Sequence, residues 1–392
     1  MISRSFLALL SKHISIGKTG SEHADKPFGG INVIICGDFH QFPPVANKKT
    51  APLYYLVNDS KNPDDAIGRA IYEQFQCVVI LSEQVRIKDP VWADFLTRIR
   101  RQETTEEDIA MLKGLILTDP NCPPTDFSAA PWKEAPLITP RHVVREQWNA
   151  AALRRHCSET GAQNRPLTVQ ERFAMAKKRA THRSRKDCGG LPNMVELAIG
   201  MKVMVTMNVK TDLDVANGSR GTIVDIILDP REPEIGAAQI VHLQYPPACV
   251  IVKLEYCRQA ALTNLQQGEI PIEPTLKTFQ IAIDANEPKL TIKRRQMPMT
   301  AAYAFTDYRA QGQTIPYVIV DIASPPSGGE LTIFNVYVAL SRSSGRDTIR
   351  LLREFNKEIL YKHVDDALLQ EDARLVMLNE ATRLWWDGHG RR

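Results

Sequence analysis

Three features are scarce in this 392-residue chain: long apolar runs, paired cysteines and a net charge of one sign. The longest apolar stretches, at 31–36 (INVIIC) and 77–81 (CVVIL), are strand-sized and far short of the ~18 residues that a membrane-spanning helix needs. The seven cysteines contain no CxxC pair, which fits neither a disulfide framework nor a zinc site. The start of the chain lacks the features of a secretory signal. We therefore expect an intracellular, soluble protein with reduced thiols.

The charge is nearly balanced, with 49 Lys+Arg against 45 Asp+Glu, a formal net charge of +4. A hydrophobic fraction of 43% is ordinary for a globular protein of two or three domains and excludes wholesale disorder and fibrous repeats. The strongest local charge lies at 172–186, which has seven Lys/Arg and no acid. Within it, residues 177–186 (KKRATHRSRK) are a candidate for phosphate contact or nuclear import, and a solvated loop is an equal alternative.

The first 120 residues alternate strand and helix signals. Residues 31–36 and 77–81 are predicted to be strands buried on both faces of a sheet, with a short amphipathic helix at 66–75 between them. Two further helices are predicted from Pro90 onward, where apolar residues recur at helical spacing and TTEED marks a helix start. Alternation of this kind favours an α/β domain with a parallel sheet.

The pattern changes after a Pro-rich stretch at 120–135, where we place a domain boundary. Between 197 and 295, short β-branched segments alternate with turn signals such as ANGSRG and YPPA, which predicts a small antiparallel barrel. A buried strand and a helix then follow, so the barrel is expected to be an insertion in a second α/β domain. The chain ends in one amphipathic helix, which we expect Trp385 and Trp386 to anchor.

Asp38 and Gln41 follow the first predicted strand, ahead of the stiff Phe42-Pro43-Pro44. Open α/β sheets bind ligands at the carboxyl ends of their strands. A carboxylate and an amide at that place are suited to orient water and Mg²⁺ at a phosphate. For a Gly-Asp pair alone, an Asp that merely caps the next turn is the more ordinary alternative.

Six short motifs occur in order: GDFHQFPPV (37–45), LSEQVR (81–86), LITPR (137–141), ANGSRG (216–221), AQGQT (310–314) and YVALSR (337–342). Together they resemble the superfamily 1B DNA helicases of the PIF (petite integration frequency) and RecD type, including Helitron-like helicases. The resemblance covers nearly all of residues 1–365. It implies an α/β fold of two RecA-like P-loop NTPase domains, the first truncated at its N-terminus, with a small SH3-like β-barrel inserted in the second.

The resemblance also implies where the domains lie. Residues 1–125 would be the C-terminal part of the first RecA-like domain, and 126–196 the start of the second with its basic arm. The barrel would occupy 197–295, the remainder of the second domain 296–365, and the tail helix 366–392.

The nucleotide-site residues are carried over from the resemblance position by position. Gln41 matches the glutamine that senses the γ-phosphate, Arg86 an arginine that reaches the phosphates, and Arg342 the arginine finger of the second domain. Guanidinium groups suit this role because they bind phosphate oxygens in pairs and balance developing charge. We expect Gln41, Arg86 and Arg342 to be catalytic, and Asp38, Gly312 and Gln313 to bind the nucleotide.

The DNA-binding residues follow in the same way. The AQGQT motif matches the segment that links the nucleotide cleft to the single-stranded DNA track. The family usually has His-Lys where this chain has Tyr308 and Arg309; the arginine keeps the charge and the tyrosine is able to stack on a base. The ANGSRG loop resembles one beside the family's barrel, with a plain hairpin turn as an equal alternative. The expected nucleic-acid-binding residues are Tyr308, Arg309, Gln311, Thr314, Asn217, Arg220, Lys177, Lys178 and Arg179.

The sequence departs from the family at its start. Family members hold ATP with a GxxxxGK[ST] loop and Mg²⁺ with a following Asp-Glu pair, and neither is found here. Residues 17–19 spell GKT, but Lys12 stands where the first glycine is needed. The segment also lies too close to GDFHQ for the family's motif order, so we interpret it as a chance match. The chain is expected to begin inside the first RecA-like domain.

The resemblance implies an ATP-dependent helicase that moves 5′ to 3′ on single strands in DNA repair, recombination and genome maintenance. ATP and Mg²⁺ would be its cofactors, single-stranded DNA and DNA junctions its partners, and the nucleus or mitochondrion its compartment, with a monomer as the expected state. The missing motifs leave a second hypothesis, a non-catalytic remnant of a transposon-type helicase that binds single strands. A third is that a sheet without its phosphate-loop strand exposes hydrophobic edges and folds poorly alone.

Overall fold

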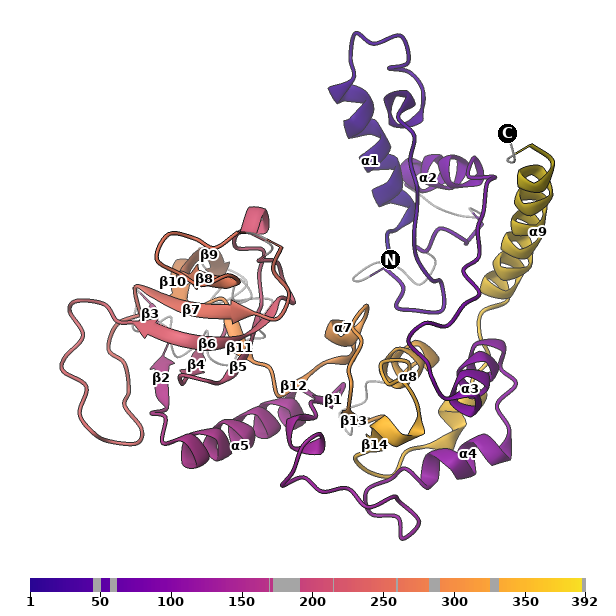
Figure 1. Ribbon diagram of the computed structural model, residues 1–392. Coiled ribbons are helices and arrows are strands. Elements are labelled where there is room, and N and C mark those ends of the chain that lie inside the picture. The colour runs from indigo at the N-terminus through magenta and orange to yellow at the C-terminus, as the bar shows by residue number, and fades with distance from the viewer. Residues whose placement is uncertain are drawn as a thin grey trace. The chain divides into compact units, whose positions relative to one another are not determined.

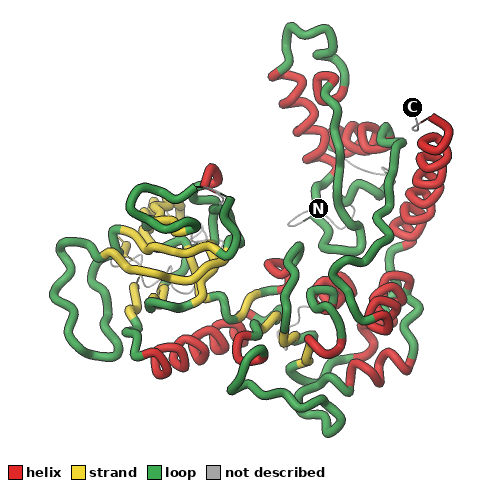
Figure 2. The backbone as a smooth tube through the Cα atoms, in the orientation of Figure 1, coloured by secondary structure: helices red, strands yellow, loops and turns green. Residues whose placement is uncertain are grey.

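The structure is a computed structural model, and it describes residues 1–44, 51–56, 62–168, 170–171, 191–213, 215–258, 260–281, 290–324 and 331–389. The chain divides into two compact units. Unit 1 comprises Met1–Pro140 and Ala310–Arg392, and unit 2 comprises Arg141–Arg309. Helices dominate the described part of unit 1, whereas most strands belong to unit 2 (Figures 1 and 2).

Unit 1 is mainly helical and contains a small sheet (Figure 1). Its elements are α1 (Arg4–Gly17), η1 (Pro27–Gly30), α2 (Pro63–Glu73), α3 (Pro90–Arg101), α4 (Glu106–Lys113), η2 (Trp132–Glu134), β1 (Leu137–Ile138), β13 (Val318–Val320), α8 (Ile333–Leu340), η5 (Arg346–Thr348), β14 (Ile349–Leu351), η6 (Lys357–Tyr361) and α9 (Asp366–His389).

The helices predicted in the first 120 residues are confirmed. The helix signal at 66–75 lies largely within α2, and the two helices predicted after Pro90 are α3 and α4. Thr105 begins α4 with a capping box, since its side chain accepts from the backbone N–H of Asp108 while the Asp108 carboxylate accepts from the backbone N–H of Thr105. Trp92 and Phe95 are fully buried on α3, as the helical spacing predicts.

The parallel sheet predicted for the first 120 residues does not form among the described residues, but a parallel sheet lies in the segments expected to form the second α/β domain. Strand β1 pairs with β13, and β13 pairs with β14, both in parallel register. All residues of these short strands are buried, which is typical of a parallel sheet covered by helices. Because α8 lies between β13 and β14 in the sequence, the sheet fixes the turn after α8 that carries Arg342.

The two strands predicted at 31–36 and 77–81 are wrong. Neither segment has regular secondary structure, and Ile34, Val79 and Leu81 are 88%, 71% and 89% exposed. A β-branched run forms a strand only where a neighbouring strand pairs with its amides, and among the described residues no strand does so here. Apolar side chains are therefore exposed along both segments.

Unit 2 begins with one long helix and continues into antiparallel sheets. Its elements are α5 (His142–Thr160), β2 (Arg165–Thr168), β3 (Gln170–Glu171), β4 (Met194–Leu197), β5 (Lys202–Val205), η4 (Thr211–Leu213), β6 (Arg220–Ile227), β7 (Cys249–Leu254), β8 (Glu269–Ile272), β9 (Thr275–Ile281), β10 (Leu290–Gln296), β11 (Met299–Ala301) and β12 (Ala304–Phe305). The four-residue helix α7 (Asp307–Ala310) lies at the border with unit 1.

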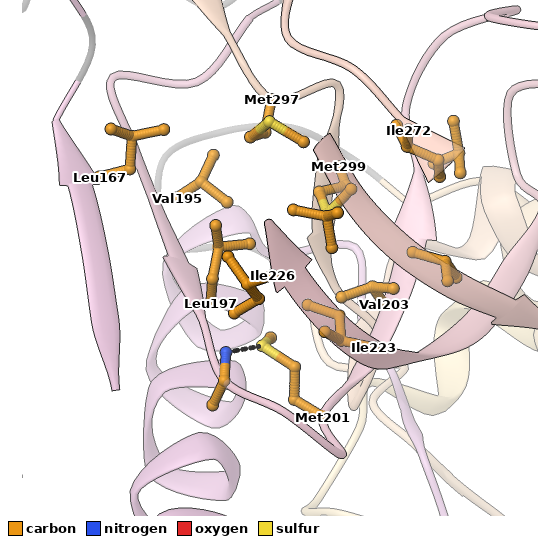
Figure 3. Packing of buried hydrophobic residues seen from close by; sticks show 14 of the residues in the cluster. Leu167, Val195, Leu197, Met201, Val203, Ile223, Ile226, Ile272, Met297 and Met299 are labelled. Atoms are coloured by element: carbon orange, nitrogen blue, oxygen red, sulfur yellow. Dashed lines mark hydrogen bonds between the residues drawn. The ribbon is translucent and has the colours of Figure 1, made fainter. Parts of the chain in front are cut away.

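The antiparallel β-structure predicted for 197–295 is confirmed. Its main sheet has the order β11-β5-β6-β7-β8, with antiparallel pairing throughout. Side chains from these strands, β2, β4 and α5 form one core. Figure 3 shows Leu167, Val195, Ile226 and Met299 converging there from different strands. Burial of this apolar surface is the main force that stabilises the unit.

The tail helix is confirmed as α9, but its predicted anchor is wrong. Trp385 and Trp386 are 56% and 59% exposed, so they do not hold the helix. The buried residues of α9 lie in its first two turns, at Leu368 and Glu371. None of the helices in the described ranges is both long and apolar enough to cross a membrane. The described cysteines are free thiols.

Candidate functional site

Unit 1 brings together two of the sequence motifs that lie far apart in the chain. The side-chain amide of Gln311 donates to Oε1 of Gln41 at 3.0 Å, across 270 sequence positions. Gln41 in turn donates from Nε2 to Oδ2 of Asp38 at 3.3 Å. The backbone N–H of Gln41 also donates to the Asp38 carbonyl at 3.1 Å, which closes a turn. The GDFHQ loop and the AQGQT motif are thus joined by one hydrogen-bonded chain.

Asp38 extends this chain to two helices. Arg100, at the end of α3, donates from Nη1 to Asp38 Oδ2 at 2.6 Å and to the Tyr337 hydroxyl of α8 at 3.0 Å. Burial by itself would raise the pKa of Asp38, but the hydrogen bond and charge of Arg100 outweigh burial and hold the pKa of that carboxyl below its ordinary value. The carboxylate therefore stays ionised and is already paired.

Arg86 contacts the AQGQT motif and the YVALSR motif. Its Nε donates to the Thr314 hydroxyl at 2.9 Å, and its Nη1 donates to the Ser341 carbonyl at 3.2 Å. Both acceptors are neutral oxygen atoms. In the ion pairs of the described residues, no carboxylate pairs with Arg86 to balance its positive charge.

Arg342 is 1% exposed and folds back on its own helix end. Its Nε donates to the Val338 carbonyl at 2.8 Å, its Nη1 to the Gln313 carbonyl at 3.1 Å, and its Nη2 to the Ser341 hydroxyl at 2.6 Å. Burial, and then the charge of Arg86, lower the pKa of Arg342 to about 10. Arg342 would have to leave these carbonyls to reach a phosphate directly.

Gly312 lies between the two glutamines of the AQGQT motif, with φ of +79°. This backbone conformation is strained for any residue with a Cβ. A Cβ at the position would meet no atom within 4 Å, so the structure requires glycine here for its conformation and not for close packing within the chain.

The expected DNA contacts of unit 2 lie on α7 and around the start of β6. Tyr308 is 53% exposed, while Arg309 is more enclosed and its Nη1 lies 3.4 Å from Met204 Sδ. Burial, and then the charge of Arg145, lower the pKa of Arg309. The Arg220 guanidinium lies over the Phe305 ring, 5.0 Å from its centroid, and the backbone N–H of Asn217 donates to Asn208 Oδ1. The predicted Lys177, Lys178 and Arg179 lie outside the described residues.

Sequence reasoning missed Arg100 and Tyr337. Arg100 stands in a basic run at the end of a helix, where positive side chains ordinarily balance the helix dipole, so nothing local marked it. Tyr337 is the first residue of the YVALSR motif, and its place there is the one signal that was present. Both residues are found only through the fold.

The fit of Mg²⁺ and of a phosphate loop is poor in the described residues. No group of three or more His, Cys, Asp or Glu side chains there is arranged to hold a metal, and Asp38 is committed to Arg100. In the GKT segment, Lys18 is the C-cap of α1. A phosphate loop precedes a helix, whereas the end of a helix carries negative partial charge and disfavours phosphate. We assign no step to a metal.

The sequence of this chain is similar to those of known ATP-dependent DNA helicases. A family model described as PIF1-like helicase matches residues 1–66. Among curated relatives, the ATP-dependent DNA helicase PIF1 of Emericella nidulans is 24% identical over 84% of this chain and 43% of its own length. The helicase RRM3 of Saccharomyces cerevisiae is 23% identical over 84% of this chain and 47% of its own length. The chain thus spans less than half the length of these relatives.

Solved structures agree on the fold. Bacteroides Pif1 bound to ssDNA covers 95% of this chain at a TM-score of 0.62 and 18% identity, with 72% of its own chain matched. Pif1 helicase from Candida albicans covers 94% at 0.59 and 19% identity, with 74% of its chain matched. The chain has the two-domain, RecA-like α/β fold of the Pif1 helicases, and its sequence is similar to those of PIF1 and RRM3 helicases.

Proposed function

We propose that this chain forms part of an ATP-dependent DNA helicase that moves 5′ to 3′ along single strands. The residues around Gln41, Arg86 and Arg342 would bind and sense the triphosphate, and those around Tyr308 and Arg309 would contact the DNA. Single-stranded DNA and DNA junctions would be its partners, in the nucleus or mitochondrion.

The hydrogen bond between Gln311 and Gln41 carries this proposal. Gln41 lies in the loop expected at the γ-phosphate, and Gln311 lies two residues after Arg309, the candidate DNA contact. A change at the phosphate that moves Gln41 would therefore also move Gln311, at the start of the DNA-contacting segment. Coupling of this kind needs a contiguous set of contacts with two arrangements, and this bond supplies one such contact.

The charges of Arg86 and Arg342 support an anion at this place. Arg86 lowers the pKa of Arg342 because two positive groups are close together. A triphosphate would relieve that repulsion, and guanidinium groups stabilise the charge on its oxygens during phosphoryl transfer. Arg342 is held by carbonyls of residues 310 and 313, so its release toward a phosphate would also disturb the AQGQT motif.

The test is ATP hydrolysis by the purified chain with and without single-stranded DNA. Arg342→Lys keeps the charge but loses the planar fork, so we expect DNA-stimulated turnover to fall about a hundredfold or more while DNA binding persists. Arg383→Lys is the matched control, because Arg383 pairs with Glu380 on the exposed face of α9. Turnover equal in both variants would refute the role of Arg342. A chain that binds DNA with no DNA-stimulated turnover would instead establish the non-catalytic alternative.

A further inference from the structure

The loop that carries Asp38 and Gln41 is also attached to the last helix of the chain. Nε2 of His40 lies 2.7 Å from Oδ2 of Asp372 on α9, across 332 sequence positions. The His40 side chain is 6% exposed, against 39% for Asp372. A buried imidazole that reaches a partly exposed carboxylate on a distant helix is a directional contact, because only one ring nitrogen meets the carboxylate.

The first turns of α9 are well fixed, so Asp372 has a defined position. Leu368 is fully buried in a cluster with Tyr54 and Val364. Glu371, which directly precedes Asp372, is 3% exposed, accepts from the Tyr72 hydroxyl and pairs with Arg374 at 2.7 Å. These contacts set both the rotation and the height of the helix beside the loop.

Phe39 gives the loop an apolar contact with the same surroundings. Its ring lies edge-on to Tyr54 with centroids 5.3 Å apart, and it packs at the margin of both the α1–α2 cluster and the α9 cluster. Apolar contacts of this kind resist separation but tolerate sliding. The hydrogen bond of the neighbouring His40 is the contact with directional character.

The position of His40 is coupled to that of both functional side chains. Its backbone N–H donates to Asp38 Oδ1 at 3.0 Å, and the next N–H, of Gln41, donates to the Asp38 carbonyl at 3.1 Å. A shift of His40 therefore alters the turn that presents Asp38 to Arg100 and Gln41 to Gln311.

We propose that His40 and Asp372 are positioning residues, through which α9 holds the Asp38–Gln41 loop in register with Arg100 and Gln311. The contact thereby makes the C-terminal helix part of the candidate site. Its functional meaning rests on the proposed function, but the positioning itself is measurable without nucleotide or DNA.

The experiment is hydrogen exchange of the full chain, read by mass spectrometry, for wild type and Asp372→Ala. We expect the amides of His40 and Gln41 to exchange about fivefold faster in the variant, the change that loss of one modest hydrogen bond gives. Exchange in the first turns of α9 and the melting temperature should stay unchanged, since Leu368 and Glu371 remain. Glu380→Ala, which removes a carboxylate from the exposed pair on the same helix, should have no effect on the loop.

Two results would overturn the proposal. Unchanged loop exchange would show that the apolar contacts suffice, and equal acceleration of the loop and α9 would show that Asp372 merely docks the helix. Asp372→Glu should restore part of the protection, because it keeps the carboxylate. Repeating the measurement with ATP tests the nucleotide site separately, so failure of the proposed function would leave a distinct signature from failure of the positioning role.

Discussion

Two strands of unit 2 and two segments of unit 1 have similar composition but different structures. They are β6 and β7 in unit 2, and residues 31–36 and 77–81 in unit 1. All four are rich in β-branched residues. Strands β6 and β7 pair with each other and with strands on both sides, and Val250 and Val252 are fully buried. In unit 1 the same kind of run has no strand beside it among the described residues, and Val79 is 71% exposed.

The difference shows that β-propensity is a preference for a paired, half-buried surface and not a property of the run alone. Strands β5, β6, β7 and β8 follow one another in the sequence and pair in that order, so the ladder and the core form together. The early part of unit 1 is stabilised by other contacts, namely close packing of α1 on α2 and polar links to α9.

The largest expected effect comes from placing one substitution in both regions. Val252→Asp puts a carboxylate in the apolar core of unit 2 and should destabilise that unit by about 4 kcal/mol or more. Val79→Asp should change the free energy of unfolding by about 0.5 kcal/mol at most, because the side chain is already in water. Urea denaturation followed by circular dichroism measures both. Equal losses would mean that segment 77–81 is buried in solution, and the comparison would fail.

A second prediction concerns what replaces strand pairing in unit 1. A Cβ on Gly68 of α2 would lie 1.9 Å from the Arg4 carbonyl oxygen of α1, so the two helices must separate to accept it. We expect Gly68→Ala to lower stability by about 1–3 kcal/mol. Gly17→Ala is the control, since a Cβ there meets nothing within 4 Å. A neutral Gly68→Ala in thermal unfolding would show that α1–α2 packing contributes little.

The smallest expected effect is the contribution of Asp38 to the pH dependence of stability. The pKa of Asp38 is held low by Arg100, so the folded state binds its proton less readily than the unfolded chain does. The stabilisation is fully present above the ordinary aspartate pKa of about 3.9 and is lost as pH falls below it through the lowered value. Asp38→Asn should flatten this acid dependence by at most about 1 kcal/mol.

The control for this measurement is Asp94→Asn, an exposed carboxylate on α3. Acid unfolding curves should differ from wild type for Asp38→Asn alone. If both variants follow the wild-type curve, the Asp38–Arg100 pair adds nothing to the stability of unit 1.

The sequence predicts what depends on neighbours along the chain. Three local signals predicted structure that is observed. They are the capping box at Thr105, the helical spacing of Trp92 and Phe95, and the β-branched segments between turn signals in unit 2. The motif order likewise indicated that Gln41 and the AQGQT segment belong to one site, and the Gln311–Gln41 bond joins them.

The sequence does not predict what depends on distant partners. Residues 31–36 have every local sign of a strand, but no residue within the run says whether another strand lies beside it. The YVALSR motif drew attention to Arg342, but nothing in the sequence indicates that its guanidinium is buried against backbone carbonyls. The contacts of Arg100 with Tyr337 and of His40 with Asp372 join positions more than 200 residues apart, so periodicity and spacing contain no information about them.

The contacts between segment 77–81 and α9 also bear on self-association. Backbone N–H groups of Val78 and Ile80 donate to Thr382 Oγ1 and Asn379 Oδ1, at 3.0 and 2.8 Å. A β-strand from a second copy of the chain that approached this edge would need the same two amides for its ladder. It would first have to displace both side chains, so α9 blunts an apolar edge that would otherwise be a template for intermolecular pairing.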